Sequence, residues 1–256
     1  MIRRQLLTGL IVVVVMTVTL GLVYPLVVTG VAQVAFHNKA NDSLLKVNGK
    51  VVGSSLLGQN FTDKNGNPIP KYFQSRPSAA GSSGYDASAS SASNLGPSNA
   101  NLIGNIPGVA ISDKTNPYAT PTDPYCVPVQ ATDKDGNPVT DKAGNAVYEK
   151  NKDGTYVCDP NTVPQRVLAY RALNGLGPNV KVPVDAVTAS GSGLDPDISI
   201  ANADLQAARV AKARHLPLAT VMSEIAKHTD GRSLGVLGEK AVNVLELNLA
   251  LDKLGK

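Results

Sequence analysis

Residues 6–36 read LLTGLIVVVVMTVTLGLVYPLVVTGVAQVAF, without a single Asp, Glu, Lys or Arg, and Arg3 and Arg4 stand just before them. A helix rises about 1.5 Å per residue and a bilayer core is about 30 Å thick, so about 20 apolar residues span it. The stretch therefore predicts a transmembrane helix from Leu6 to about Val28. We expect Pro25 to kink this helix, or to end it near the far interface.

Two other interpretations compete with a membrane anchor. A cleaved signal peptide has an apolar region of about 7–15 residues, shorter than this one, followed by a small-x-small site. Gly30-Val31-Ala32 does provide such a site, so a signal peptide stays an alternative. A buried helix of a soluble protein normally carries a polar face, which the threonines of this stretch do not form.

The charges that flank the anchor predict its orientation. Arg3 and Arg4 have no acidic residue near them, and basic residues mark the cytoplasmic end of a membrane helix. We therefore expect a single-pass protein with a cytoplasmic N-terminus and an extracytoplasmic soluble domain.

Composition limits what the soluble domain can be. The chain is 43% hydrophobic with the anchor included, only 4% aromatic and without Trp, so Val, Leu, Ile and Ala must build the core. The net charge of +4 is not gathered into a basic run, which argues against nucleic-acid binding. The pattern along the chain predicts an α/β (α+β) soluble domain behind one transmembrane helix, with a hairpin-rich insertion.

Cys126 and Cys158 are the two cysteines of the chain, and both lie in a turn-rich region. Outside the cytoplasm they are free to pair. Such a disulfide would contribute about 3 kcal/mol by restricting the unfolded chain. Two free thiols or a metal site are the alternatives, but the usual four ligands of a metal are lacking, so we expect no metal.

Four segments follow from composition: the anchor at 1–36, an irregular part at 37–103, the insertion at 104–161 and a compact part at 162–256. Within 37–103, Asn48-Gly49 predicts a two-residue hairpin turn, because both residues tolerate a positive φ. Residues 78–98 have the Ser-, Ala- and Gly-rich composition of a disordered linker.

The insertion carries a series of turn signals, at Asp133–Pro138, Asp141–Asn145 and Asp153-Gly154. They predict a small meander of hairpins pinned by the two cysteines. Asp133-x-Asp135-Gly136 suggests a calcium loop, but the positions that need Gly and Glu hold Pro138 and Gly144, so calcium is disfavoured.

The compact part predicts helices and strands. Thr162 caps a helix that Gly175 ends, a second helix runs from near Ser199 through Arg214, and a third begins at Pro217 and stops at Gly231. Apolar residues alternate over 242–251, and this period of two predicts a strand beside another over 182–188.

Catalytic machinery is hard to find in this sequence. His37, His215 and His228 form no metal or catalytic motif, and neither a nucleophile elbow nor a Walker sequence is present. Gly191-Ser192-Gly193 suits a tight turn better than a cradle for an anion, although both stay open. We predict that the chain is not an enzyme by itself.

Several phrases resemble the C subunit of the Kdp potassium-transporting P-type ATPase. They are GQNF (58–61), YFQSRPS (72–78), YDAS (85–88), SNLGPSN (93–99), VTASGSGLDP (187–196), RVAKAR (209–214) and VNVLELNLALD (242–252). The resemblance covers the anchor, 44–102 and 162–254 in the family's order, whereas 104–161 departs from it.

The resemblance implies an accessory subunit of an ATP-driven, high-affinity K⁺ import complex in a bacterial cell membrane. Its implied partners are a channel-like membrane subunit, the P-type catalytic subunit and a small membrane subunit. The family has been proposed to raise the catalytic subunit's affinity for ATP, which implies ATP acting through the complex. The phosphorylated Asp-Lys-Thr-Gly loop of the catalytic subunit is absent here, and we expect no cofactor of the chain's own.

The predicted orientation places the soluble domain where ATP is not supplied, which favours a role in assembly or in covering the outer mouth of the K⁺ pathway. Because the phrases at 72–99 and 187–196 are too specific for a spacer, we expect ordered loops that dock the partners. The docking candidates are Asn60, Arg76, Tyr85, Asn94, Asn99, Ser190, Asp195 and Arg209. No nucleotide-binding residue can be named. An anchored extracytoplasmic binding module for a small ligand or a cell-wall component is the alternative function.

Overall fold

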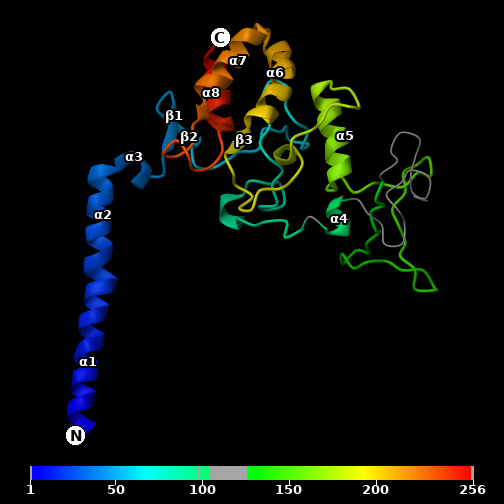
Figure 1. Cartoon of the computed structure of the whole chain (residues 1–256). Helices are drawn as coiled ribbons and strands as arrows, with labels where there is room; N and C mark the ends of the chain where they lie inside the picture. The colour runs from blue at the N-terminus through cyan, green and yellow to red at the C-terminus, as the bar shows by residue number, and fades with distance from the viewer. Residues whose placement is uncertain (1, 97, 104–125, 255–256) are drawn as a thin grey trace. The chain divides into compact units, whose positions relative to one another are not determined.

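A computed structural model describes residues 2–96, 98–103 and 126–254 (Figure 1). The chain divides into two compact units, Met1–Leu56 and Leu57–Lys256. The first unit holds the apolar stretch and a hairpin, and the second holds the candidate site. Each unit is described by itself.

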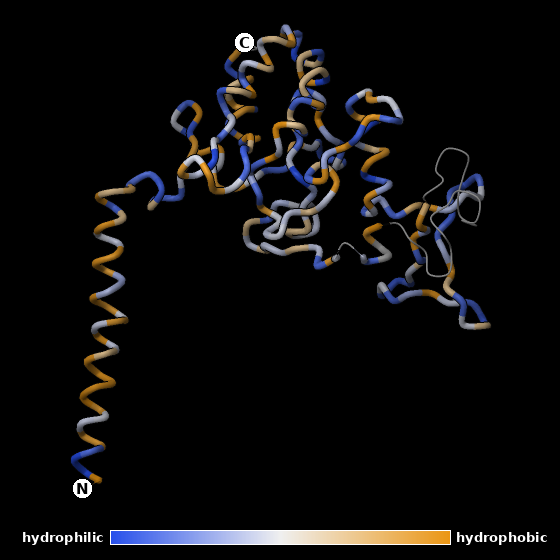
Figure 2. Tube along the Cα trace, in the orientation of Figure 1, coloured by the Kyte–Doolittle hydropathy of each residue, from blue (hydrophilic) through white to orange (hydrophobic). Residues whose placement is uncertain are grey.

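The apolar stretch of the first unit forms one helical run. It consists of α1 (Ile2–Val18), the π-helical turn η1 (Thr19–Val23) and α2 (Tyr24–Ala35). Its mean hydropathy reaches 2.7 and none of that window is buried, so by length and composition it can cross a membrane. Figure 2 shows apolar residues along most of its length and polar ones at the N-terminal end.

The helix does not end at Pro25, contrary to one of the two outcomes that we expected. Pro25 occupies the first turn of α2, and the helix continues to Ala35. Because proline has no N–H, the carbonyl of Gly21 loses its usual partner, and the wider π-helical turn η1 lies at this place. Pro25 therefore changes the helical winding locally and does not end the helix.

A hairpin follows the short helix α3 (His37–Ala40). Strands β1 (Leu44–Val47) and β2 (Lys50–Ser54) pair antiparallel, with Val47 opposite Lys50. Asn48 and Gly49 between them have φ values of 50° and 79°. A type I′ turn requires positive φ at both central residues, so the predicted hairpin is confirmed.

The second unit is an α+β domain, as predicted. Its main helices are α5 (Val163–Asn174), α6 (Ile200–Arg214), α7 (Leu218–Lys227) and α8 (Val244–Leu254), and it also contains a small antiparallel sheet. The sheet has the order β3-β5-β4, from Asp197–Ser199, Ala241–Asn243 and Thr229–Asp230. The shorter helices η2 (Ala87–Ala89) and α4 (Ala100–Ile103) precede α5 in sequence, and η3 (Val184–Ala186) lies between α5 and β3.

The predicted helix boundaries are largely confirmed. The Thr162 hydroxyl accepts a hydrogen bond from the backbone N–H of Gln165, and Gly175, with a φ of 63°, closes α5. The Ser199 hydroxyl caps α6 in the same way. Helix α7 starts after Pro217 but ends at Lys227, because Thr229 and Asp230 enter the sheet before Gly231 is reached.

Both predicted strands of the compact part are wrong. Of residues 242–251, only the first two lie in a strand, at the end of β5, and the rest belong to α8, with Val244, Leu247 and Leu251 fully buried. These positions fit a helical repeat as well as the alternation, which is why the period of two misled the prediction. Residues 182–188 form a loop with the 3₁₀ turn η3 instead of a strand.

The described part of the insertion is a meander of tight turns, as predicted. Isolated bridges join Pro128 to Cys158 and Gln130 to Tyr148. Cys126 and Cys158 form a disulfide, with their sulfurs 2.03 Å apart, so this prediction is confirmed. In the first turn the Asp133 carboxylate accepts backbone N–H groups of Asp135 and Asn137, and these bonds lower the pKa of Asp133.

Residues 70–74 run from a turn at the surface to the core, which they enter at Phe73 without pairing with a strand. Phe73 is completely buried with the core residues of α6 and α8. The Asn248 side chain bonds both the N–H and the carbonyl of Phe73, at 2.8 and 3.0 Å. The Gln206 side chain does the same for Gln74, at 2.7 and 3.1 Å. Side chains of two helices therefore supply the hydrogen bonds that a sheet would provide.

Candidate functional site

Two segments with the linker-like and glycine-rich phrases pack on each other, and we call residues 58–95 and 187–196 the loop layer. The Ser78 hydroxyl donates to the carbonyl of Gly193 at 2.6 Å, and Ser190 N–H donates to Pro77 at 3.2 Å. Gly58 N–H donates to the carbonyl of Leu194 at 2.8 Å. The expectation of ordered loops is confirmed, because serine hydroxyls and backbone groups that would bind water in a disordered linker bind one another here.

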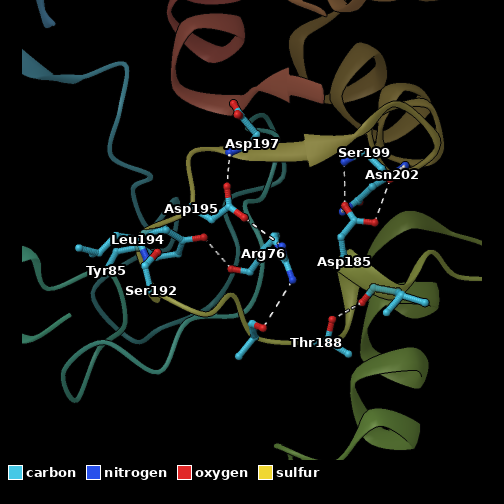
Figure 3. A network of polar contacts seen from close by, with 12 residues as sticks. Arg76, Tyr85, Asp185, Thr188, Ser192, Leu194, Asp195, Asp197, Ser199 and Asn202 are labelled. Carbon is cyan, nitrogen blue, oxygen red and sulfur yellow. Dashed lines mark hydrogen bonds and ion pairs between the residues drawn. The ribbon is translucent and has the colours of Figure 1, made fainter. Parts of the chain in front are cut away.

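Arg76 and Asp195 form an ion pair within this layer, with 2.9 Å between Nη1 and Oδ2 (Figure 3). Their side chains are 25% and 30% exposed. The other oxygen of Asp195 accepts the backbone N–H of Asp197 at 3.2 Å. The pair therefore joins the two segments of the layer, and each charge already has a partner inside the chain.

Tyr85 fixes the bend beside this pair. Its hydroxyl donates to the carbonyl of Arg76 at 2.8 Å, and its own N–H donates to the Ser78 hydroxyl. Burial raises the pKa of Tyr85 to about 12, so the phenol stays protonated and keeps its donor at neutral pH.

The other docking candidates occupy different surroundings. Asn60 is exposed and donates to the carbonyl of Ser83 at 2.7 Å, and Asn94 is exposed with a φ of 55°. Asn99 is partly buried, and its carbonyl accepts the backbone N–H groups of Leu102 and Ile103 at the start of α4. The Ser190 side chain is 2% exposed and bonds no described atom through its hydroxyl. The loop layer thus brings together Asn60, Arg76, Tyr85, Asn94, Ser190 and Asp195.

Arg209 lies outside the loop layer's two segments, in a buried cluster beside residues 70–74. It donates to Asn174 and Gln206, and to the carbonyls of Pro70 and Tyr72. Burial lowers its pKa to about 10, which still leaves it charged at neutral pH. All of these hydrogen bonds are made within the domain. Arg209 therefore stabilises the core rather than offering a free group to a partner.

Two glycines allow the close approach of the layer's segments. A Cβ on Gly58 would come 2.4 Å from the carbonyl oxygen of Asp195 and 2.4 Å from the Tyr85 ring. A Cβ on Gly193 would lie 2.6 Å from the carbonyl oxygen of Ser91. Residues 190–193 form a turn, with Gly193 at a φ of 69° and its N–H bonded to the carbonyl of Ser190. The turn interpretation of this glycine motif is confirmed.

A hollow of about 390 Å³ lies between the loop layer and helices α5 and α6. Tyr85, Arg166, Tyr170 and Gln206 are among its lining residues. Burial raises the pKa of Tyr170, whose hydroxyl donates to Asn202 at 2.8 Å, and burial lowers the pKa of Arg166. Rings, amides and a guanidinium can bind a small molecule, but this lining holds no nucleophile with an adjacent base.

Asp185 stabilises the start of α6 beside the hollow and was not identified from the sequence. The Asp185 carboxylate accepts hydrogen bonds from the N–H and hydroxyl of Ser199 and from the Asn202 amide, at 2.8–2.9 Å (Figure 3). It reinforces the cap of α6 from a loop, and no local sequence pattern announces such a distant cap. Among the residues that the structure describes, no three His, Cys, Asp or Glu gather as a metal site.

The fold and the site together define a class: a membrane-associated chain with one candidate spanning helix, and an α+β domain that carries an ordered loop layer. The family model described as "KdpC: K+-transporting ATPase, c chain" matches residues 6–136 and 149–253. The chain therefore belongs to the KdpC family of K⁺-transporting ATPase subunits. The expectation that residues 104–161 depart from the family is wrong for most of their length, because the match includes 104–136 and 149–161 and leaves out only residues 137–148.

Curated relatives carry the name "Potassium-transporting ATPase KdpC subunit". One from Mycobacterium tuberculosis is 44% identical, over 98% of this chain and 100% of the relative. One from Gemmatimonas aurantiaca is 43% identical, over 91% of this chain and 85% of the relative. One from Koribacter versatilis is 38% identical, over 98% and 95%.

The contact at Gly58 predicts a large difference between two glycine substitutions. Gly58→Ala forces a methyl group against the backbone of Asp195 and should lower the free energy of unfolding by about 1–3 kcal/mol. Gly191→Ala is the control, because a Cβ there meets nothing within 4 Å. It should change that free energy by about 0.5 kcal/mol or less. Urea unfolding of the purified chains in detergent measures both, and equal stabilities would contradict the packing of the layer.

Proposed function

We propose that the chain is a non-catalytic subunit that assembles and stabilises an ATP-driven K⁺ import complex. Membership of the KdpC family carries this proposal. The loop layer supports it, because the layer is a fixed polar surface built by internal hydrogen bonds rather than a set of reacting groups. Preformed surfaces of this kind lose little conformational entropy when a partner binds.

The proposed partners are a channel-like membrane subunit, a P-type catalytic subunit and a small membrane subunit. The anchor helix is one route to them, since none of its apolar window is buried in the described chain and its side chains need lipid or other helices around them. The exposed edge of the loop layer, near Asn60 and Asn94, is the proposed second contact.

Arg76 and Asp195 enter the proposal in an indirect role. Because they pair with each other at 2.9 Å, they fix the relative position of the layer's segments. Loss of either charge would loosen the docking surface.

The proposed orientation places the N-terminus in the cytoplasm and the α+β domain outside. Arg3 and Arg4 precede the apolar helix, and cytoplasmic ends of membrane helices carry such residues. The Cys126–Cys158 disulfide supports this orientation, because disulfides persist in oxidising compartments. In this orientation any effect on the ATP affinity of the catalytic subunit must pass through the membrane subunits, and the chain itself needs no cofactor.

A second candidate function rests on the hollow beside α5 and α6. Its 390 Å³ are enough for a small ligand, so an anchored extracytoplasmic binding module is the alternative. The complex-forming role is preferred because it follows from the family.

Co-purification tests the assembly role. A tagged full-length chain, expressed with the other pump genes, should bring the channel-like and catalytic subunits from solubilised membranes. Replacing residues 106–160 with a short linker should leave this yield and K⁺-limited growth within about twofold of wild type, because the compact part provides its own core.

The control for this experiment is a chain that lacks residues 1–36. It should lose the complex, because the anchor provides one of the two contacts. A pump that assembles and supports growth equally well without the whole chain would refute the assembly role.

Cysteine labelling tests the orientation. In a Cys126→Ser/Cys158→Ser background, Lys134→Cys lies on an exposed turn and should react with a membrane-impermeant maleimide in intact cells. Ile2→Cys is the matched control, 73% exposed at the other end of the helix, and should react only after lysis. The reverse pattern would place the domain in the cytoplasm.

A further inference from the structure

The loop between β4 and β5, residues 231–240, carries apolar side chains into solvent. Leu234 is 90% exposed, Val236 74% and Leu237 59%. We call Leu234, Val236 and Leu237 the aliphatic knob. Solvent exposure of one such side chain is ordinary, but three within four residues at a loop tip form a concentrated apolar surface.

The backbone conformation at Leu234, the first leucine of the knob, is unfavourable for a leucine. Leu234 and Gly235 have φ values of 55° and 80°, and Val236 N–H bonds the carbonyl of Ser233. These values match the 50° and 79° of Asn48 and Gly49 in the β1–β2 turn. Asn-Gly is the preferred pair for such a turn, whereas a leucine pays a steric cost at positive φ. The chain therefore places leucine where both the backbone and water disfavour it.

The knob has a fixed shape. Ser233 and Leu237 exchange two backbone hydrogen bonds, each 2.9 Å long. Below them Arg232 and Glu239 form an ion pair at 2.9 Å. A rigid apolar projection loses little entropy on binding, so it is suited to a preformed pocket.

We propose that the aliphatic knob inserts into an apolar pocket on another subunit of the K⁺ pump. The proposal rests on the assembly role proposed above and names the contact that performs it. A protein pocket fits better than a lipid surface, because residues 231–240 contain no Trp, Tyr or Phe, and Arg232 is paired with Glu239, which leaves Lys240 as the one basic residue of this loop without an ion pair to a described residue. Surface-seeking segments instead combine aromatic side chains with unpaired basic ones.

Leu234→Asn separates binding from folding. It restores the Asn-Gly pair that the same chain uses at 48–49, so the melting temperature should stay the same or rise. Binding to the rest of the pump should weaken about tenfold or more, because the burial of a leucine side chain is lost. Val184→Asn is the matched control: Val184 is 73% exposed on η3, away from the knob, and its replacement should not change binding.

The measurement is titration of the full-length chain in detergent into purified pump that lacks this subunit. Unchanged affinity for Leu234→Asn would overturn the inference. Failure of the wild-type chain to bind would instead refute the assembly role. The two failures are thus distinguishable.

A photo-crosslinking residue at position 236, in the otherwise wild-type chain, provides an independent readout in native membranes. Crosslinking to a pump subunit supports the proposal. Crosslinking only to lipid, or only to a second copy of this chain, overturns it.

Discussion

The structure of the second unit depends on how segment 70–74, which enters the core at Phe73, satisfies its backbone hydrogen bonds. A chain that enters a core normally joins a sheet, since a buried N–H or carbonyl without a partner costs about 1–3 kcal/mol. Here the side-chain amides of Gln206 and Asn248 take the place of a neighbouring strand. Each amide offers a donor and an acceptor, as a peptide group does, so one side chain serves a whole residue.

This arrangement ties the loop layer to the helices. Arg209 and Arg214 complete it by donating to the carbonyls of residues 70–72. Phe73 is thereby held in the core, and Gln74 leads directly into Arg76 and its ion pair with Asp195. The rigidity of the surface proposed to bind the pump subunits therefore depends on the hydrogen bonds that hold segment 70–74. A buried polar cluster of this kind specifies a single arrangement, because partial satisfaction would be costly.

Local signals in the sequence predicted the elements that depend on local physics. The cap at Thr162, the helix start near Ser199, the Asn48-Gly49 turn and the apolar run of the anchor involve residues close in sequence, and all are found. The strand predicted over 242–251 failed, because that sequence satisfies two periods and only tertiary packing decides between them.

The candidate site also depends on long-range contacts that local sequence patterns do not predict. Composition predicts a disordered linker at 78–98, yet hydroxyls such as Ser78 bond groups more than a hundred residues away. The resemblance in these phrases indicated order, but it could not reveal that Arg76 and Asp195 bind each other. Gln206 and Asp185 escaped notice because each binds groups outside its own element: Gln206 binds Gln74, and Asp185 binds the start of α6. Such long-range pairings have no local pattern.

Amide hydrogen exchange of the full-length chain is the most direct test of this account. The N–H groups of Phe73 and Gln74 should exchange as slowly as that of Val210 in the core of α6, because they are released only when the domain unfolds. The exposed turn residue Lys64 should exchange quickly and serves as the reference for a loop. Exchange of Phe73 and Gln74 at the rate of Lys64 would show that the side-chain amides do not hold the segment, and would contradict the account.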